Sequence, residues 1–284
     1  MLLNALIFDV DGTLAETEEA HRQSFNEAFA AFGLGWNWDE ELYRKLLQIT
    51  GGKERLQHYI DAWRPPGSDV AQSNFAGIYE EASARYAALV ESGAVRARPG
   101  IRRLIAEAHE RGVRLAIATT SLKDSVITML RTILGEDGFA KFAVIAAGDA
   151  VPNKKPAPDI YLLALKRLGC EPESCVAIED STNGIKAARA AGLHVLASPS
   201  HYLRGDDFSL ATSVLSDLGE PHTPNRQIAG LSFDRDYVDI DGLNAWLCKQ
   251  QKIGAAPYAA HDQINMRAAR TGRSARSSAT PYLK

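Results

Sequence analysis

Short apolar runs alternate with amphipathic stretches over the C-terminal two thirds of this chain. The runs carry apolar residues on both faces, which is typical of strands in a parallel sheet that helices cover on both sides. The predicted strands are 6–8, 113–118, 142–147, 175–178, 193–197 and 213–215, and the predicted helices between them are 101–111, 125–134, 159–168 and 184–191. This alternation predicts an α/β fold with a doubly wound parallel sheet.

The pattern changes between the first and second predicted strands. Residues 16–96 place their apolar positions at helical spacing and contain no strand pattern. The predicted helices here are 18–32, 39–49 with Asp39 as N-cap, 53–63, and 75–90. We therefore expect an α-helical cap domain at 16–96, inserted into a core formed by 1–15 and 97–248.

The end of the chain has a different composition. Residues 249–284 lack apolar periodicity and carry seven Lys or Arg against one Asp, a formal charge of +6 in a chain whose net charge is −3. This composition predicts a disordered basic tail. Such a tail either binds an anionic partner or is simply solvated, and we favour the second interpretation.

Composition also narrows the class of protein. A net charge of −3 gives no general attraction to nucleic acid or to anionic membranes. No apolar run approaches the ~20 residues of a membrane span. A signal peptide would require basic residues near its start, and no Lys or Arg precedes Arg22. Three cysteines without a Cys-x-x-Cys pair indicate a reduced, cytoplasmic protein without structural zinc. We expect a monomer with a small-molecule partner.

The first candidate chemistry follows the first strand, at Asp9-Val10-Asp11-Gly12-Thr13. Two carboxylates two residues apart lie on one face of an extended chain, and Gly12 allows a sharp turn. Carboxylates at the carboxyl edge of an open sheet suit Mg²⁺ and a phosphate group. A turn without chemistry is the alternative. An EF-hand is excluded because Gly12 stands fourth rather than sixth.

Two later segments add hydroxyl and ammonium groups. Thr119-Thr120-Ser121 ends the second strand, where hydroxyls and amides can hold phosphate oxygens, or can simply cap the next helix. Lys155 lies in a stiff segment before Pro156 and Pro158, so its side chain can be directed at one point. The alternative for Lys155 is an ordinary solvated loop lysine.

A further acidic segment ends the strand at 175–178. Glu179-Asp180-Ser181 follows that apolar strand, where acids are costly unless they are paired or bind metal. An N-cap formed by Asp180 or Ser181 is the alternative. Asn183 turns the chain into the next helix and is a candidate substrate-binding residue. All these segments should meet at one edge of the sheet.

In this order and setting, the motifs resemble those of the haloacid-dehalogenase-like phosphohydrolases with a helical cap. Asp9–Thr13 matches the first family motif, Thr119 the second, Lys155 the third and Glu179-Asp180 the fourth, and the resemblance spans residues 1 to about 248. It implies that Asp9 forms an aspartyl phosphate and that Asp11 acts as acid and base.

The same resemblance implies the remaining roles in the site. Thr119 and Lys155, with the neighbouring Thr120 and Ser121, would hold the phosphoryl oxygens. Mg²⁺ would be bound by Asp9, the backbone carbonyl of Asp11 and Asp180, and Glu179 would act on it directly or through another group.

Two stretches of the cap bear on the substrate. Glu16 and His21 follow the catalytic loop and are candidates for contacts to sugar hydroxyls. Gly51-Gly52-Lys53-Glu54-Arg55 offers backbone amides and two cations, which could bind an anion or could be an ordinary helix start. Both stretches look like the CbbY-type branch of the family. That similarity implies a phosphatase for xylulose 1,5-bisphosphate, an inhibitory by-product of carbon-fixing Rubisco.

Two alternative functions remain at this point. A sugar phosphate mutase similar to β-phosphoglucomutase shares the aspartate pair, the cap and His21. A phospho-acceptor signalling domain of the receiver type also uses aspartates at strand ends, but its phosphorylated aspartate ends a later strand and no large cap follows. Glu16 and the Gly51–Arg55 segment favour the phosphatase over the mutase.

Overall fold

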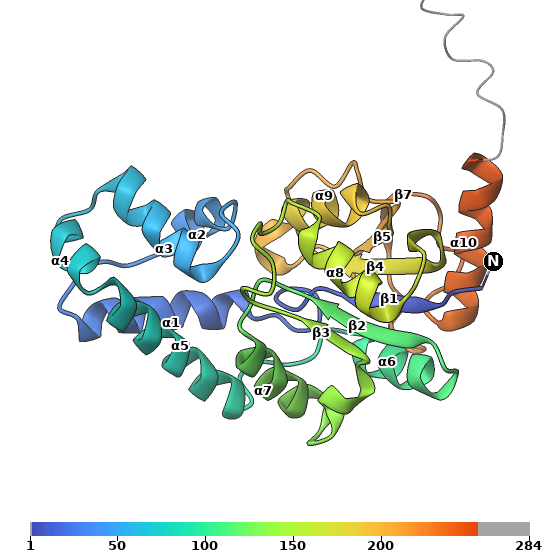
Figure 1. Ribbon diagram of the computed structural model, residues 1–284, viewed down its shortest axis with the longest axis horizontal. Helices are drawn as coiled ribbons and strands as arrows, with labels where there is room; N and C mark the ends of the chain where they lie inside the picture. Colours follow the sequence, from blue (N-terminus) through green and yellow to red (C-terminus); the bar gives the residue numbers. More distant parts are fainter. Residues whose placement is uncertain (1, 255–284) are drawn as a thin grey trace, which may run out of the picture. The chain divides into compact units, whose positions relative to one another are not determined.

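The computed structural model describes residues 2–254 of the chain. Seven strands of this part form one sheet in the order β3-β2-β1-β4-β5-β6-β7 (Figure 1). The strands are β1 Ala5–Phe8, β2 Arg114–Ala118, β3 Val144–Ala146, β4 Cys175–Glu179, β5 His194–Ala197, β6 Ser213–Leu215 and β7 Gln227–Gly230. All neighbours pair in parallel except β6 and β7, which are antiparallel. The predicted α/β fold with a doubly wound sheet is confirmed.

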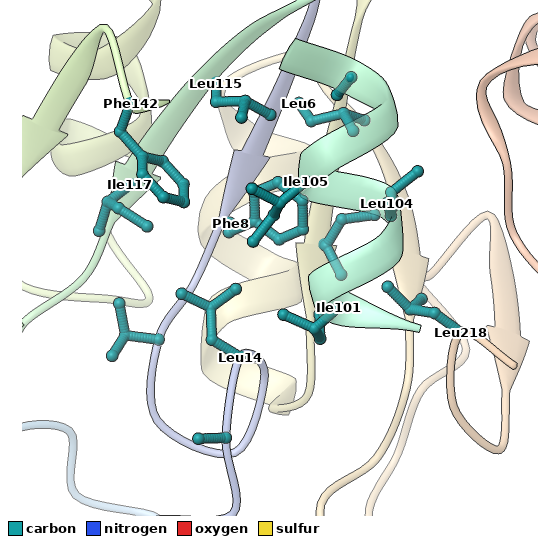
Figure 2. Packing of buried hydrophobic residues seen from close by; sticks show 14 of the residues in the cluster. Leu6, Phe8, Leu14, Ile101, Leu104, Ile105, Leu115, Ile117, Phe142 and Leu218 are labelled. Atoms are coloured by element: carbon teal, nitrogen blue, oxygen red, sulfur yellow. The ribbon is translucent and has the colours of Figure 1, made fainter. Parts of the chain in front are cut away.

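Helices cover both faces of the sheet because alternate residues of each buried strand point to opposite sides. Leu6 and Phe8 of β1 belong to one apolar cluster, which includes Leu104 and Ile105 (Figure 2), whereas Ala5 and Ile7 belong to the other. The core helices are α6 Ile101–Glu110, α7 Lys123–Leu134, α8 Asp159–Leu168, α9 Thr182–Ala190 and α10 Ile240–Gly254. The sheet is therefore a rigid support for whatever lies at the ends of its strands.

Helices alone make up the regular structure of the segment between β1 and α6, which was predicted to be a cap and is called the cap below. They are α1 Glu18–Ala31, α2 Glu40–Leu46, α3 Gly52–His58 with a π-helical turn Tyr59–Trp63, α4 Ser68–Ser73 and α5 Phe75–Glu91 (Figure 1). The segment has its own apolar cluster, in which the fully buried Trp38 packs against the rings of Phe25 and Phe29. Residues 1–247 nevertheless form one compact unit, so the division into core and cap stays a prediction.

The structure confirms one predicted helix cap and differs from the sequence prediction in several other elements. The Asp39 N-cap is confirmed, since its carboxylate accepts a hydrogen bond from the Leu42 backbone N–H at 2.8 Å. The short helix α4 and the edge strand β7 were not predicted. Helix α10 continues to Gly254, past the predicted start of the tail at 249. The rest of the predicted tail lies outside the described residues. Within 2–254, no helix is both long and apolar enough to cross a membrane.

Candidate active site

Three adjacent strands bring the first group of candidate residues together. Phe8 of β1 pairs with Ile117 of β2 on one side and with Ile178 of β4 on the other. Because all three strands run in parallel, the residues that follow them meet at one edge of the sheet. Asp9 continues β1 by donating its backbone N–H to the Ile178 carbonyl at 3.0 Å. This edge is where the sequence predicted the site.

The turn after β1 depends on Gly12. Its φ of +76° is a backbone conformation that residues with a side chain rarely adopt. A Cβ atom at this position would lie 2.0 Å from Oδ2 of Asp180. The glycine therefore allows the loop after β1 to approach the loop after β4, and that approach brings Asp9 and Asp180 into one site.

Lys155 is buried between two carboxylates. Its Nζ lies 2.6 Å from Oδ1 of Asp9 and 2.7 Å from Oε1 of Glu179. Burial alone would lower the pKa of Lys155, but the charges of Asp9 and Glu179 outweigh burial and raise it above its ordinary value. Burial raises the pKa of Asp9 to about 8, against the opposing effect of the Lys155 charge. Lys155 is thus a fixed cation in contact with the carboxylate of Asp9.

Asp11 has different surroundings from Asp9. Its Oδ1 accepts a hydrogen bond from Thr17 Oγ1 at 2.7 Å and lies 3.2 Å from Nε2 of His21, while Ser121 Oγ donates to its Oδ2. The ring of His21 stacks on Tyr86, whose hydroxyl is 3.4 Å from the same Oδ1. Burial would raise the pKa of Asp11, but the hydrogen bond and charge of His21 outweigh it, so the pKa lies well below its usual range.

Glu179 is already engaged on both of its carboxylate oxygens. Oε1 accepts from Lys155 and from the hydroxyl of Tyr161, each at 2.7 Å. Oε2 accepts from the backbone N–H groups of Asp180 and Ser181 and from the Ser181 hydroxyl, at 3.1 to 3.3 Å. This side chain therefore fixes Lys155 and the loop after β4. Ser181 also caps α9, so of the two proposed N-caps Ser181 is the one observed.

The acidic groups at this edge have the chemistry of a cation site. Carboxylate oxygens of Asp9, Glu179 and Asp180 all lie within 4.8 Å of one another. Burial, together with the charges of Asp9 and Glu179, raises the pKa of Asp180 well above its ordinary value. Among the ion pairs of the described residues, Lys155 alone balances this group. The raised pKa values of Asp9 and Asp180 reflect acidic groups that lie close together with little positive charge beside them, and an all-oxygen donor set of this kind fits Mg²⁺.

A cavity of about 130 Å³ opens beside these groups. Most of the candidate residues line it, namely Asp9, Asp11, His21, Gly51, Gly52, Arg55, Thr119, Thr120, Ser121, Lys155 and Asp180. The sequence prediction missed Glu18, Tyr79 and Tyr86, which also line it. Their positions on helices α1 and α5 carry no local motif, so only the fold reveals them.

Four candidate residues do not line the cavity: Glu16, Lys53, Asn183 and Glu179. The ammonium of Lys53 lies over the ring of Tyr79, 5.2 Å from its centroid. Asn183 instead donates its side-chain amide to the Gln48 carbonyl and to Thr50 Oγ1 in the cap, both at 3.0 Å. The roles predicted for Lys53 and Asn183 in substrate binding stay predictions.

Glu16 pairs with a residue that the sequence analysis did not single out. Its Oε1 lies 3.2 Å from Nε of Arg98, and its Oε2 accepts from the His201 backbone N–H at 3.3 Å. Arg98 is buried and donates to the carbonyl oxygens of Gly12, Ser198 and Pro199. The signal that could have found Arg98 is its place before Pro99-Gly100, where the chain returns from the cap.

On the cap side of the cavity, Arg55 is held in a fixed position. Its NH1 donates to the hydroxyl of Tyr43 at 3.0 Å, and that hydroxyl donates to Oε2 of Glu18 at 2.8 Å. Its Nε donates to the Leu46 carbonyl at 3.3 Å. Arg55 is only 8% exposed, so its hydrogen bonds fix the position of a buried cation beside the cavity.

Comparison with known proteins places this geometry in context. A family model described as haloacid dehalogenase-like hydrolase matches residues 6–198. Protein CbbY of Rhodobacter capsulatus is 49% identical over 223 residues, which cover 78% of this chain and 97% of that protein. The crystal structure of a CbbY mutant from Rhodobacter sphaeroides in complex with xylulose-(1,5)bisphosphate has a TM-score of 0.70 at 46% identity, covering 76% of this chain and 95% of that one. A putative β-phosphoglucomutase from Thermotoga maritima has a TM-score of 0.56 at 27% identity, covering 74% and 93%.

Proposed function

This chain belongs to the haloacid dehalogenase-like hydrolases and is a phosphoric monoester hydrolase acting on sugar phosphates, and we propose that its substrate is xylulose 1,5-bisphosphate. The products are xylulose 5-phosphate and inorganic phosphate. The single observation that carries the proposal is that Asp9 and Asp11 line one cavity together with Thr119, Lys155 and Asp180.

Asp9 is the nucleophile in this proposal. Its Oδ1 is paired with Lys155, so an oxygen of the carboxylate remains to attack phosphorus and form an aspartyl phosphate. Lys155 and the hydroxyl of Thr119 then bind the oxygens of the transferred group, with the backbone amides of Thr120 and Ser121 beside them. Phosphoryl transfer depends chiefly on alignment and charge balance, and buried groups fixed by neighbours provide both.

Asp11 is the general acid and base. It donates a proton to the sugar oxygen that leaves phosphorus, and then takes a proton from the water that cleaves the aspartyl phosphate. The hydrogen bonds from Thr17, His21 and Ser121 fix its orientation. A phosphate dianion entering the cavity opposes the ionised form of Asp11, which favours uptake of the proton that the first step needs.

Asp9, the backbone carbonyl of Asp11 and Asp180 would hold Mg²⁺, while Glu179 positions Lys155 and the loop after β4. Bound Mg²⁺ would supply positive charge that offsets the repulsion between these carboxylates and the phosphate. The donor set supports this assignment because its carboxylate oxygens lie close together and too little positive charge lies beside them.

The cap supports a bisphosphate rather than a monophosphate. Arg55, Gly51 and Gly52 line the same cavity as the aspartates and would bind the second phosphate, with Lys53 next to them in the sequence. His21 also lines this cavity, where its ring could contact a sugar hydroxyl. The CbbY mutant whose structure contains xylulose bisphosphate supports the same sugar for this chain.

The test is phosphate release from a panel of sugar mono- and bisphosphates with Mg²⁺. We expect the highest kcat/KM with xylulose 1,5-bisphosphate, and a loss on the order of a thousand-fold or more in Asp9→Asn. Activity should disappear on chelation of Mg²⁺. Faster release from monophosphates would contradict the proposed substrate, and conversion of hexose 1-phosphate to 6-phosphate without net hydrolysis would favour the mutase.

A further inference from the structure

One short segment of the cap is joined to the core at three points. The amide of Gln48 donates to Oδ2 of Asp206 at 3.0 Å, and Asn183 donates to the Gln48 carbonyl and to Thr50. The third contact is an ion pair between Lys154 Nζ and Oε1 of Glu54, at 2.6 Å. The same segment, from Leu47 to Arg55, supplies much of the cap side of the cavity. What holds this segment against the core therefore also closes the cavity.

Lys154 links the loop that carries Lys155 to the cap. It precedes Lys155, the residue that contacts Asp9, and its own side chain points to the cap instead of the cavity. Burial would lower the pKa of Lys154, but Glu54 and Asp149, the latter at 3.4 Å, outweigh it and raise that pKa. The ammonium is thus charged at neutral pH and attracts Glu54 across the boundary between cap segment and core.

Glu54 is built into the start of α3. Its Oε2 is buried, and a Cβ atom at Gly51 would lie 2.1 Å from it. Gly51 has φ of +97°, so this position requires a glycine both for its backbone and for the space that the carboxylate fills. The absence of a side chain at Gly51 leaves room for the Glu54 carboxylate beside the backbone, where it can reach Lys154.

We propose that Lys154 and Glu54 form a latch that holds the cap segment from Leu47 to Arg55 closed over the bound phosphate. Both are positioning residues without contact to the substrate. The inference rests on the proposed function for the identity of the natural substrate. A bisphosphate adds its own contacts to the cap and so helps to close it. A small phosphate ester without such contacts depends on the latch for closure.

This difference predicts a split between two kinetic constants. If closure is required for the reaction, weakening the latch lowers the fraction of competent enzyme. In Lys154→Met, xylulose 1,5-bisphosphate should show KM raised roughly five-fold at unchanged kcat, because the bound substrate restores closure. With p-nitrophenyl phosphate, kcat itself should fall roughly five-fold, because nothing restores closure. Lys154→Arg should keep both constants close to wild type.

A double-mutant cycle tests the pair itself. Glu54→Gln should reproduce both effects of Lys154→Met, and the double variant should be no worse than either single variant. The matched control is Lys45→Met, which removes the exposed Lys45–Glu41 pair within the cap and should change neither constant. Thermal unfolding of each variant should show that the chain remains folded under assay conditions.

Three other outcomes overturn the latch. A raised KM for the bisphosphate with an unchanged small ester would make Lys154 a direct contact to the second phosphate. An equal fall of kcat on both substrates would mean that Lys154 only supports Lys155. Unchanged constants on both would mean that the ion pair has no role in closure. If wild type releases no phosphate from xylulose 1,5-bisphosphate, the proposed function fails, and the small-ester arm still tests the latch.

Discussion

Arg98 shows how one buried side chain can organise several loops around a site. Its guanidinium donates to carbonyl oxygens in the turn after β1 and in the segment after β5, and it pairs with Glu16 at the entry to the cap. These carbonyl groups lie in irregular backbone, where strand pairing cannot satisfy them. Arg98 is therefore expected to hold the turn that carries Asp11.

We predict that Arg98→Met lowers the free energy of unfolding by about 2–4 kcal/mol, because it leaves buried carbonyl oxygens without donors. Urea unfolding measures this loss. Arg102→Met is the matched control, since that arginine is exposed on α6 and its replacement should stay within about 0.5 kcal/mol. Equal effects of the two substitutions would show that the hydrogen bonds of Arg98 contribute nothing net.

Residues of the site differ in how far the sequence could identify them. Asp9 and Glu179 stand at the ends of apolar strands, where a polar residue is distinct, and Lys155 stands before two prolines that stiffen its loop. Thr17 and Tyr86, which hold Asp11, lie at or within helices of the cap, where polar and aromatic residues are ordinary. Glu16 pairs with Arg98 in the structure because the chain returns from the cap beside its point of entry, and the contact of Glu16 to a sugar hydroxyl stays a prediction.

At the scale of elements, the sequence predicted those with a strong burial pattern. Strands β1, β2 and β4 are buried almost throughout, so their apolar runs are distinct. Strand β7 is exposed at all four positions and carries no alternation, so it was missed. Helix α4 has only six residues and follows Pro65-Pro66-Gly67, a segment typical of a helix end, so no helix was predicted there. The predicted helix 53–63 changes to a π-helical turn at Tyr59, which periodicity does not distinguish.

The start of α3 gives a prediction at this scale. Gly51→Ala should destabilise the chain through its positive φ, and should also displace the carboxylate of Glu54 from its place beside Lys154. We expect the KM for the bisphosphate to rise by at least as much as in Glu54→Gln, roughly five-fold. Gly33→Ala is the control, because Gly33 also has positive φ but nothing lies within 4 Å of the added Cβ.

Gly33→Ala should lower stability by about 1 kcal/mol with unchanged kinetics. Urea unfolding and steady-state kinetics on both variants separate backbone strain from displacement of Glu54. If Gly51→Ala and Gly33→Ala have the same kinetics as wild type, the close approach of Glu54 to Gly51 has no bearing on the substrate.

For the whole molecule, topology explains why a set of weak local signals defined one site. Aspartates, hydroxyls, a lysine and further acids lie far apart in the chain, and each has an ordinary alternative. Parallel strands β2, β1 and β4 are neighbours in the sheet, so their carboxyl ends converge. The motif segments could be predicted to meet at one edge of the sheet because each of them follows a predicted parallel strand. Contacts between cap and core, such as Lys154 with Glu54, depend on how two separate segments meet, and no periodicity encodes that.

Residues 255–284 allow a final test. The cavity is lined by residues between Asp9 and Leu203, and the CbbY relative from Rhodobacter capsulatus aligns over 97% of its length with 223 residues of this chain. Five basic residues and one acid lie after Gly254, so a chain that ends there has a net charge of −3 − 4 = −7. We predict that this truncation leaves kcat and KM within about two-fold at physiological salt, where the field of the net charge is screened beyond ~8 Å.

At low salt the truncated chain should bind the anionic substrate less readily, because its more negative field repels a bisphosphate over a longer distance. The measurement is kcat/KM for the full and the truncated chain at about 10 and 150 mM salt, where the Debye length falls from about 30 to 8 Å. A large loss at the higher salt, with unchanged thermal stability, would mean that residues after Gly254 take part in the reaction itself. A loss confined to low salt would assign them a purely electrostatic role in substrate capture.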